Sequence, residues 1–131
     1  VLAKRGLRNG GYEISLGKFL GGLIKVGVGT VVLTDGANGA FLATGSDLYF
    51  REAPHVVAAA TTGAGDAFSA TFACYSTQTN DVARALSAAA LNAASVVKFV
   101  DTQSGLLTLQ ALEAEIESAA ATAPSLHSWS I

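Results

Sequence analysis

A glycine-rich stretch at residues 61–68 constrains this chain more than any other part of it. Its sequence is Thr61-Thr62-Gly63-Ala64-Gly65-Asp66-Ala67-Phe68, and an alanine-rich pattern with helical spacing follows it. Gly63 and Gly65 carry no Cβ, so the backbone can turn sharply and its N–H groups can approach a ligand closely. The first N–H groups of the following helix have no partner within that helix. The stretch therefore predicts an anion-binding turn at the start of a helix.

Asp66 is predicted to lie in the first turn of that helix, where the positive end of the helix dipole favours a carboxylate. A base next to fixed N–H donors is the arrangement that phosphoryl transfer to a hydroxyl requires. Gly63, Ala64 and Gly65 are therefore a candidate anion hole, and Asp66 is a candidate general base. The alternative is that the same residues form only a tight loop and an N-terminal cap.

The stretch resembles the second signature of the PfkB (ribokinase-like) carbohydrate kinases. Upstream, Thr34-Asp35-Gly36-Ala37-Asn38-Gly39-Ala40 resembles the Thr-x-Gly-x-x-Gly turn that precedes that signature in the family. The order and the separation of the two motifs fit as well, and the resemblance runs from about Gly17 to Leu112. It implies an α/β fold, a three-layer α/β/α sandwich of ribokinase-like type, of which this chain is the C-terminal portion.

The resemblance also implies an activity, the ATP-dependent phosphorylation of a sugar or sugar-like hydroxyl. Its cofactors are ATP and Mg²⁺, and its partners are the sugar substrate and ATP. The nucleotide-binding residues that carry over are Thr34, Gly36, Gly39, Asn92, Thr102 and Gly105. For Asn92 an exposed helical asparagine is the alternative interpretation. No metal site made by the protein alone is expected, because His55 and His127 are far apart and have no second ligand at a suitable spacing.

Two positions depart from the family pattern. Ala60 stands where relatives commonly have an aspartate, six residues before the candidate base, in a region that helps hold a monovalent cation. Ala60 has no side-chain oxygen, so the sequence argues against potassium activation, with Thr62 and backbone carbonyls as the ligands that remain. The segment from Asp101 to Gly105 also differs from the family's usual Thr-Arg-x-Gly-Ala. This difference weakens the match on the adenine side.

Composition and charge exclude several classes of protein. The chain has 131 residues, half of them apolar, which is enough for one domain with a core and predicts a single domain over residues 1–131. Eight basic and ten acidic residues give a net charge of −2 without a basic run, so no nucleic-acid partner is expected. No charge-free stretch is long enough to cross a membrane, so no membrane partner is expected either. A single cysteine cannot form an internal disulfide, and the first eight residues lack an apolar core of signal-peptide type, so we expect a cytoplasmic location.

The length of the chain suggests that part of a kinase is absent. Members of the family are typically more than twice as long and keep most of their sugar-binding residues in the N-terminal half. We therefore expect either a fragment or a truncated product that lacks that half, with the possibility of a homo-oligomer. The alternative function is a non-catalytic, nucleotide-binding remnant that needs a partner. The sequence does not choose among ribose, a ketohexose, a sugar phosphate and a nucleoside as the substrate.

Local patterns predict the order of the elements. After a loose, glycine-punctuated leader over residues 1–11, apolar spacing predicts a helix over 12–26. A β-branched run over 30–34 predicts a strand of a parallel sheet that is buried on both faces. Two strands at 40–43 and 48–51 and an extended piece at 56–58 follow. Helices are predicted over 65–76 and from 80 to about 100, the second with an apolar face that includes Ala93 and Val97. A last helix is predicted after its cap Thr108, with Leu109, Leu112 and Ile116 spaced for burial and three glutamates facing outward. The tail beyond Ala119 is expected to fray.

Overall fold

The alternation of side chains along one central strand organises the fold. The computed structural model describes residues 6–9, 12–120 and 127–130. Strand β4 (Ala40–Thr44) lies between β3 (Thr30–Thr34) and β5 (Asp47–Arg51), and both ladders are antiparallel. β4 places Ala40 and Leu42 in one hydrophobic cluster and Phe41 and Ala43 in another. Because successive side chains of a strand point to opposite faces, both faces of this sheet are covered.

The sheet has four described strands in the order β3-β4-β5-β6. β6 (His127–Ser130) pairs antiparallel with β5, so this part of the tail forms an edge strand where fraying was predicted. Residues 121–126, the rest of that tail, lie outside the described residues. The prediction of a parallel sheet is wrong for every ladder in the described part of the chain. β3 packs on both faces, since Val31 and Leu33 contact one cluster and Val32 the other, but its residues are half-buried or exposed, so the predicted burial of both faces is wrong in degree.

Helix α2 (Leu16–Lys25) covers the first face of the sheet. Its Leu16 and Leu20 are buried against Phe41 and other residues of β4 and β5. The side chain of Ser15 accepts a hydrogen bond from the N–H of Lys18 at 3.4 Å, so the helix begins after Ser15 and not at the predicted Tyr12.

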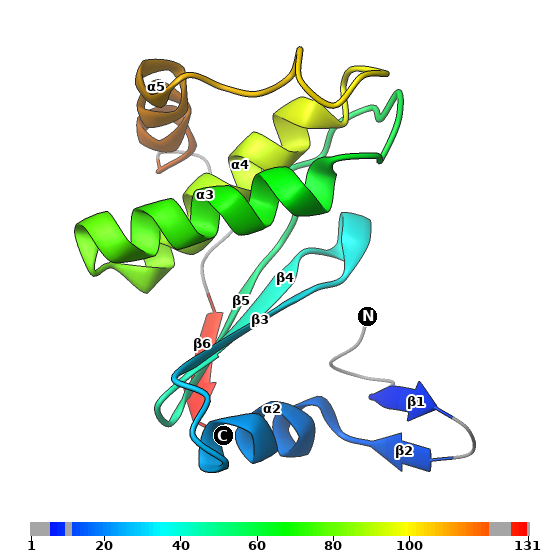
Figure 1. Ribbon diagram of the computed structural model, residues 1–131, viewed down its shortest axis with the longest axis vertical. Helices are drawn as coiled ribbons and strands as arrows, with labels where there is room; N and C mark the ends of the chain where they lie inside the picture. The colour runs from blue at the N-terminus through cyan, green and yellow to red at the C-terminus, as the bar shows by residue number, and fades with distance from the viewer. Residues whose placement is uncertain (1–5, 10–11, 121–126, 131) are drawn as a thin grey trace.

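The residues before Ser15 form a short hairpin. β1 (Leu7–Asn9) pairs antiparallel with β2 (Tyr12–Ile14), and Figure 1 places this hairpin next to α2. The loose leader is therefore wrong for residues 7–9, and the predicted helix is wrong for residues 12–14. Residues 1–5, 10 and 11 lie outside the described part of the chain.

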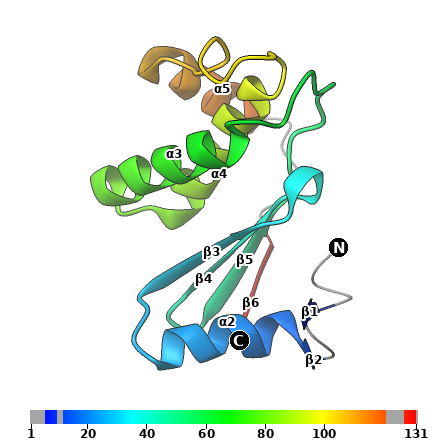
Figure 2. The same cartoon turned by 45° about the vertical axis from the view of Figure 1, so that its right-hand side comes forward.

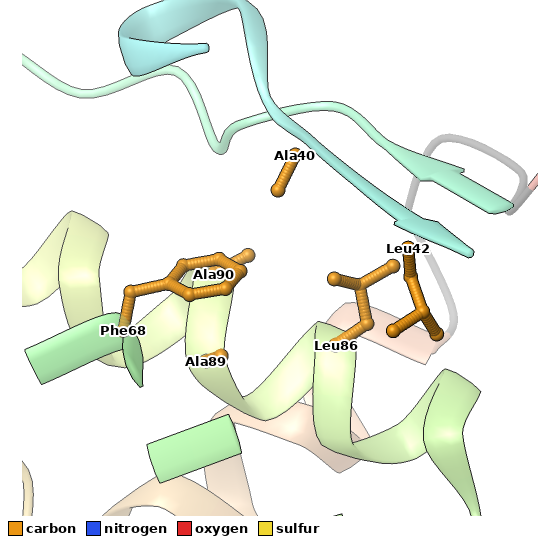
Figure 3. Close-up of a cluster of buried hydrophobic side chains, with 6 residues drawn as sticks. All are labelled: Ala40, Leu42, Phe68, Leu86, Ala89 and Ala90. Carbon is orange, nitrogen blue, oxygen red and sulfur yellow. The ribbon is translucent and has the colours of Figure 1, made fainter. Parts of the chain in front are cut away.

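Helices α3 (Ala64–Thr79) and α4 (Val82–Val96) cover the second face. Phe68 of α3 and Leu86, Ala89 and Ala90 of α4 meet the side chains of Ala40 and Leu42, as Figure 3 shows. The sheet thus lies between α2 on one side and α3 and α4 on the other (Figures 1 and 2). These are the three layers of the predicted α/β/α sandwich.

The α3–α4 pair also supports a last helix, α5 (Leu109–Ala120). Leu112 and Ile116 of α5 are buried against Tyr75, as their spacing predicted, and Thr108 caps the helix by accepting a hydrogen bond from the N–H of Ala111 at 3.2 Å. Leu109 was expected to be buried as well, but its side chain is 64% exposed.

One of the three glutamates of α5 does not face outward. Glu113 accepts a hydrogen bond from the hydroxyl of Tyr75 at 2.7 Å and forms an ion pair with Arg84. Since Tyr75 lies on α3 and Arg84 on α4, this carboxylate connects three helices.

Candidate active site

The two glycine motifs meet at one cleft. The cleft has a volume of about 370 Å³ and is lined by Thr34, Gly36 and Gly39 from the first motif and by Thr61, Ala64 and Gly65 from the second. Phe68 and Ala90, which belong to the hydrophobic cluster of Figure 3, form part of its wall. Thus two segments that are separated in the sequence face the same space.

The first motif needs both of its glycines for reasons of backbone geometry. A short 3-10 turn, η1 (Gly36–Asn38), follows β3, and the N–H of Asp35 donates to the carbonyl oxygen of Gly39 at 2.7 Å. Gly36 has a φ of +54° and Gly39 a φ of +126°, which side chains with a Cβ disfavour. At Gly39 a Cβ would also overlap the carbonyl oxygen of Arg51. The turn therefore brings bare backbone to the edge of the cleft.

The second motif forms the start of α3. Gly63 is the N-cap with a φ of +84°, and its carbonyl oxygen accepts from the N–H of Ala67 at 2.9 Å. The N–H of Ala64 donates to Thr61, whereas the N–H groups of Gly65 and Asp66 find no acceptor within the described part of the chain. Free N–H groups at a helix start attract anions. The side chain of Asp66 is exposed in this first turn, so its carboxylate is accessible to a substrate.

The loop over residues 101–105 packs behind this anion-binding turn. The carboxylate of Asp101 accepts hydrogen bonds from the N–H groups of Gln103 at 2.9 Å and Ser104 at 2.7 Å. These hydrogen bonds, that to Ser104 first, lower the pKa of Asp101 to about 2. A Cβ built on Gly63 would stand 2.9 Å from the side chain of Thr102, so the loop touches the turn.

Gly105 closes the loop against the end of α4. It is buried, and a Cβ there would stand 2.5 Å from the Cα of Val96. Neither Thr102 nor Gly105 lines the cleft itself. Both residues lie behind the turn, and their predicted contact with the nucleotide stays a prediction.

Asn92 is buried at 7% exposure, so it is not the exposed helical asparagine of the alternative interpretation. Its Nδ2 donates to the hydroxyl of Thr71 at 2.8 Å, and its Oδ1 accepts from the N–H of Leu107 at 3.0 Å. Thr71 in turn donates to the carbonyl oxygen of Ala67 at 2.7 Å. The amide of Asn92 thus connects the first turns of α3 to the end of the loop that carries Thr102. It does not line the cleft, so a direct contact with the nucleotide stays a prediction.

Sequence reasoning missed part of the cleft wall. Ala93 and Ala94 of α4 and its C-cap residue Val97 line the cleft, and so do Pro54 and His55. The sequence signal was present, since Ala93 and Val97 belong to the predicted apolar face, but such a face does not distinguish packing against a helix from contact with a ligand. His55 was considered only as a metal ligand.

Ala60 lies in a segment that is fixed to the end of α4. The carbonyl oxygen of Val97 accepts hydrogen bonds from the N–H groups of Ala59 at 2.7 Å and Ala60 at 3.3 Å. This segment leads directly into Thr61 and the anion-binding turn. The same helix end therefore supports both the turn and the loop over residues 101–105.

Among the residues that the structure describes, no three His, Cys, Asp or Glu side chains gather in a way that could hold a metal ion. No described helix is long and apolar enough to span a membrane.

Solved kinases of ribokinase type share this fold. A ribokinase from Thermotoga maritima matches with a TM-score of 0.72 at 24% sequence identity, over 79% of this chain and 35% of that one. An E. coli protein designated Ribokinase II, solved with ATP and Mg²⁺, has a TM-score of 0.70 at 26% identity, over 76% and 32% of the two chains. A fructokinase from Vibrio cholerae O395, solved with fructose, ADP and calcium ion, has a TM-score of 0.68 at 26% identity, over 78% and 35%. The protein is therefore of the ribokinase-like class.

The sequence also identifies the family. The family model described as "pfkB family carbohydrate kinase" matches residues 13–109, which include both glycine motifs. The chain belongs to this family. No curated protein matches it. The chain spans about a third of the length of the solved kinases named above.

Proposed function

We propose that this chain forms the nucleotide side of a kinase that transfers a phosphoryl group from ATP to the hydroxyl of a sugar or sugar-like substrate. The observation that carries the proposal is the position of Asp66. Its exposed carboxylate stands in the same helical turn as the free N–H groups of Gly65 and Asp66. Asp66 does not itself line the cleft, but Gly65, the residue before it, does. A base and an anion site are thus adjacent.

In this proposal Asp66 takes the proton from the acceptor hydroxyl as its oxygen bonds to the terminal phosphorus of ATP. The bond between that phosphorus and the bridging oxygen breaks, and ADP leaves. The N–H groups of Gly63 and Gly65, with that of Asp66, stabilise the negative charge on the transferred group, and Ala64, whose N–H is bonded to Thr61, holds the turn of this anion hole. Since these donors are fixed by the α3 turn, they need no rearrangement during the reaction.

The residues present fit a magnesium nucleotide. Bare backbone with open space at Gly36 and Gly65 leaves room for phosphates, and Gly39 allows the turn that carries Gly36. The apolar wall at Ala93 and Val97 suits the flat face of a base. Mg²⁺ bound with the phosphates neutralises their charge and draws electron density toward the leaving group. Thr34 completes the set of residues that contact the nucleotide in this proposal. Asn92, Thr102 and Gly105, which the family resemblance also implies, lie behind the cleft and support it from there.

The proposal leaves the acceptor side to other residues. In the described part of the chain β3 pairs on one edge only, and apolar side chains such as those of Val26 and Val57 are exposed to solvent. An unpaired strand edge readily accepts another strand. We assign this edge to further kinase sequence or to a second copy of the chain.

The proposal also includes a weak dependence of the kinase on potassium, because Ala60 provides no carboxylate to bind the cation.

A second candidate is a non-catalytic nucleotide-binding protein. Ala60 favours it, since relatives commonly carry an aspartate there, and so does a cleft formed by only about a third of the length of the solved kinases. Both candidates bind Mg·ATP through the same residues. They differ in what Asp66 does.

Replacement of Asp66 by asparagine separates the two candidates. In a protein that carries this segment and phosphorylates a sugar, we expect Asp66→Asn to lower turnover by about 10² to 10⁴, because asparagine cannot accept the proton. Mg·ATP binding, measured by calorimetry, should change far less. Asparagine is itself a good helix-start residue, so the melting temperature should stay close to that of the parent.

Near-normal turnover in the Asp66→Asn variant would refute the assignment of the base. Loss of Mg·ATP binding in Gly65→Val, with Asp66→Asn still binding, would identify the anion site independently of catalysis. A parent chain that binds no Mg·ATP at all would refute both candidates.

A further inference from the structure

The contact between Thr102 and Gly63 involves a methyl group. The atoms nearest to a Cβ built on Gly63 are Cβ and Cγ2 of Thr102, each at 2.9 Å, and the Cα of Thr102 follows at 3.4 Å. Within the described residues the hydroxyl of Thr102 makes no hydrogen bond. The apolar side of Thr102 therefore faces the α-carbon of Gly63, and no polar contact accounts for its position.

Gly63 is the residue whose conformation fixes the anion-binding turn. Its φ of +84° directs its carbonyl oxygen to the N–H of Ala67 and orients the N–H groups that follow. Glycine adopts this conformation without a steric penalty, but it also leaves it easily, because glycine has many other conformations available. A side chain packed against Gly63 restricts that freedom.

Thr102 is itself held on both sides. The carboxylate of Asp101 accepts two N–H groups of the same loop, and Gly105 is packed on Val96 and Ser95 at the end of α4. Beyond the loop, the N–H of Leu107 donates to the buried amide of Asn92, which is bonded to Thr71 of α3. The loop is therefore anchored to the helix that Gly63 starts and to the helix beside it.

We propose that Thr102 is a positioning residue whose methyl group packs against Gly63 and holds the anion-binding turn in its binding conformation. This inference rests on the proposed function, because the proposed function makes the phosphates of ATP the ligand of the turn. It differs from the assignment of Thr102 as a nucleotide ligand, in which the hydroxyl would be the active group. The two assignments make opposite predictions for two conservative substitutions.

Thr102→Val keeps the methyl group and the branched Cβ but loses the hydroxyl, whereas Thr102→Ser keeps the hydroxyl and loses the methyl group. We expect Thr102→Ser to weaken Mg·ATP binding by about fourfold, the value of one lost methyl contact, and Thr102→Val to bind as the parent does. Calorimetry with Mg·ATP on the 131-residue chain measures this. Weaker binding in Thr102→Val than in Thr102→Ser, or equal binding in all three proteins, would refute the inference.

Amide hydrogen exchange tests the same inference without a nucleotide. The N–H groups of Ala64 and Ala67 are bonded to the backbone on either side of the turn, to Thr61 and Gly63. Both should exchange faster in Thr102→Ser and at the parent rate in Thr102→Val. Unchanged rates in Thr102→Ser, or faster rates in both variants, would overturn the role of the methyl group. A parent that binds no Mg·ATP would refute the proposed function alone, because the exchange rates would still decide whether Thr102 positions the turn.

Discussion

Asp101 shows how a single exposed residue can order a loop. Its carboxylate replaces a backbone acceptor for two successive N–H groups, those of Gln103 and Ser104, and so closes a tight turn. This turn closes the loop that supports Gly63, in a segment whose sequence differs from the family's usual Thr-Arg-x-Gly-Ala.

The pKa of Asp101 makes this turn testable by pH. The hydrogen bonds lower its pKa to about 2, below the ordinary value of 3.8. A carboxyl with a lowered pKa stabilises the folded loop above its ordinary pKa and loses that effect as the pH falls through the folded value. We expect the amide resonances of Gln103 and Ser104 to shift between about pH 4 and pH 2, with a midpoint near the lower value.

Asp101→Asn is the control for this titration, because its side-chain oxygen still accepts the hydrogen bonds but does not titrate. Its amide resonances should stay constant over the same range. A midpoint near pH 4 in the parent would mean that the carboxylate is not bonded to the loop in solution.

The helical layer depends on a contact that involves three elements. Glu113 of α5 accepts from Tyr75 of α3 and pairs with Arg84 of α4. Burial, first, and the hydrogen bond to Glu113, second, raise the pKa of Tyr75 to about 12. Because Leu109 at the start of α5 is exposed, this polar contact and the two buried residues Leu112 and Ile116 hold the helix in place.

We expect Tyr75→Phe to lower the free energy of unfolding by about 1.5 to 3 kcal/mol, the usual effect of losing a hydrogen bond to a charged group. Urea denaturation near pH 7 measures it. Tyr49→Phe is the matched control, since Tyr49 is half-buried on β5 and its hydroxyl makes no hydrogen bond in the described part of the chain, and it should change stability by less than about 0.5 kcal/mol.

The difference between Tyr75→Phe and the parent should also depend on pH. A tyrosine whose pKa is raised stabilises the fold below its ordinary pKa of 10 and loses that contribution as the pH rises through about 12. The two proteins should therefore approach each other in stability from pH 10 toward pH 12. A difference that stays constant over this range would contradict the hydrogen bond to Glu113.

The elements that sequence predicted best are those with local signals. The strands at 40–44 and 47–51 lie between turn residues, and the helix start at Asp81 has a capping side chain that accepts from the N–H of Arg84 at 2.9 Å. The hairpin before Ser15 and the antiparallel direction of β3 and β4 involve neighbouring segments, but apolar spacing does not specify which strands pair or in which direction. The pairing of β6 depends on β5, a partner distant in sequence, and periodicity carries no information on such partners. The outward-facing prediction for Glu113 failed for the same reason, because Tyr75 is 38 residues away.

On the scale of the whole molecule, the glycine motifs located the site but not its walls. Gly36, Gly39 and Gly63 were identifiable because their backbone conformations require glycine. The alanines and Val97 of α4 were not, since small apolar residues look the same whether they pack against a helix or face a ligand. The buried position of Asn92 depends on Thr71 and on Leu107, and neither contact has a signature in the sequence.

The last prediction concerns the chain by itself. We expect the 131-residue chain to bind Mg·ATP but to phosphorylate ribose or fructose only at trace rates. The described part of the chain supplies the candidate base and the phosphate donors, whereas rapid transfer also requires the acceptor hydroxyl to be held in line with the terminal phosphorus. Loss of that orientation removes an effective concentration of about 10⁵ M or more.

The measurement is sugar-dependent ADP release, with Asp66→Asn as the control for background hydrolysis. The parent and the Asp66→Asn variant should release ADP at similar low rates, because without a positioned acceptor the base has no proton to take. Fast ADP release that requires both the sugar and Asp66 would contradict this prediction, and it would place the acceptor-binding residues within the chain itself. The exposed edge of β3 would then be the first place to look for them, because a second copy of the chain that pairs there would bring further side chains close to the β3 end of the cleft, where Thr34 lies.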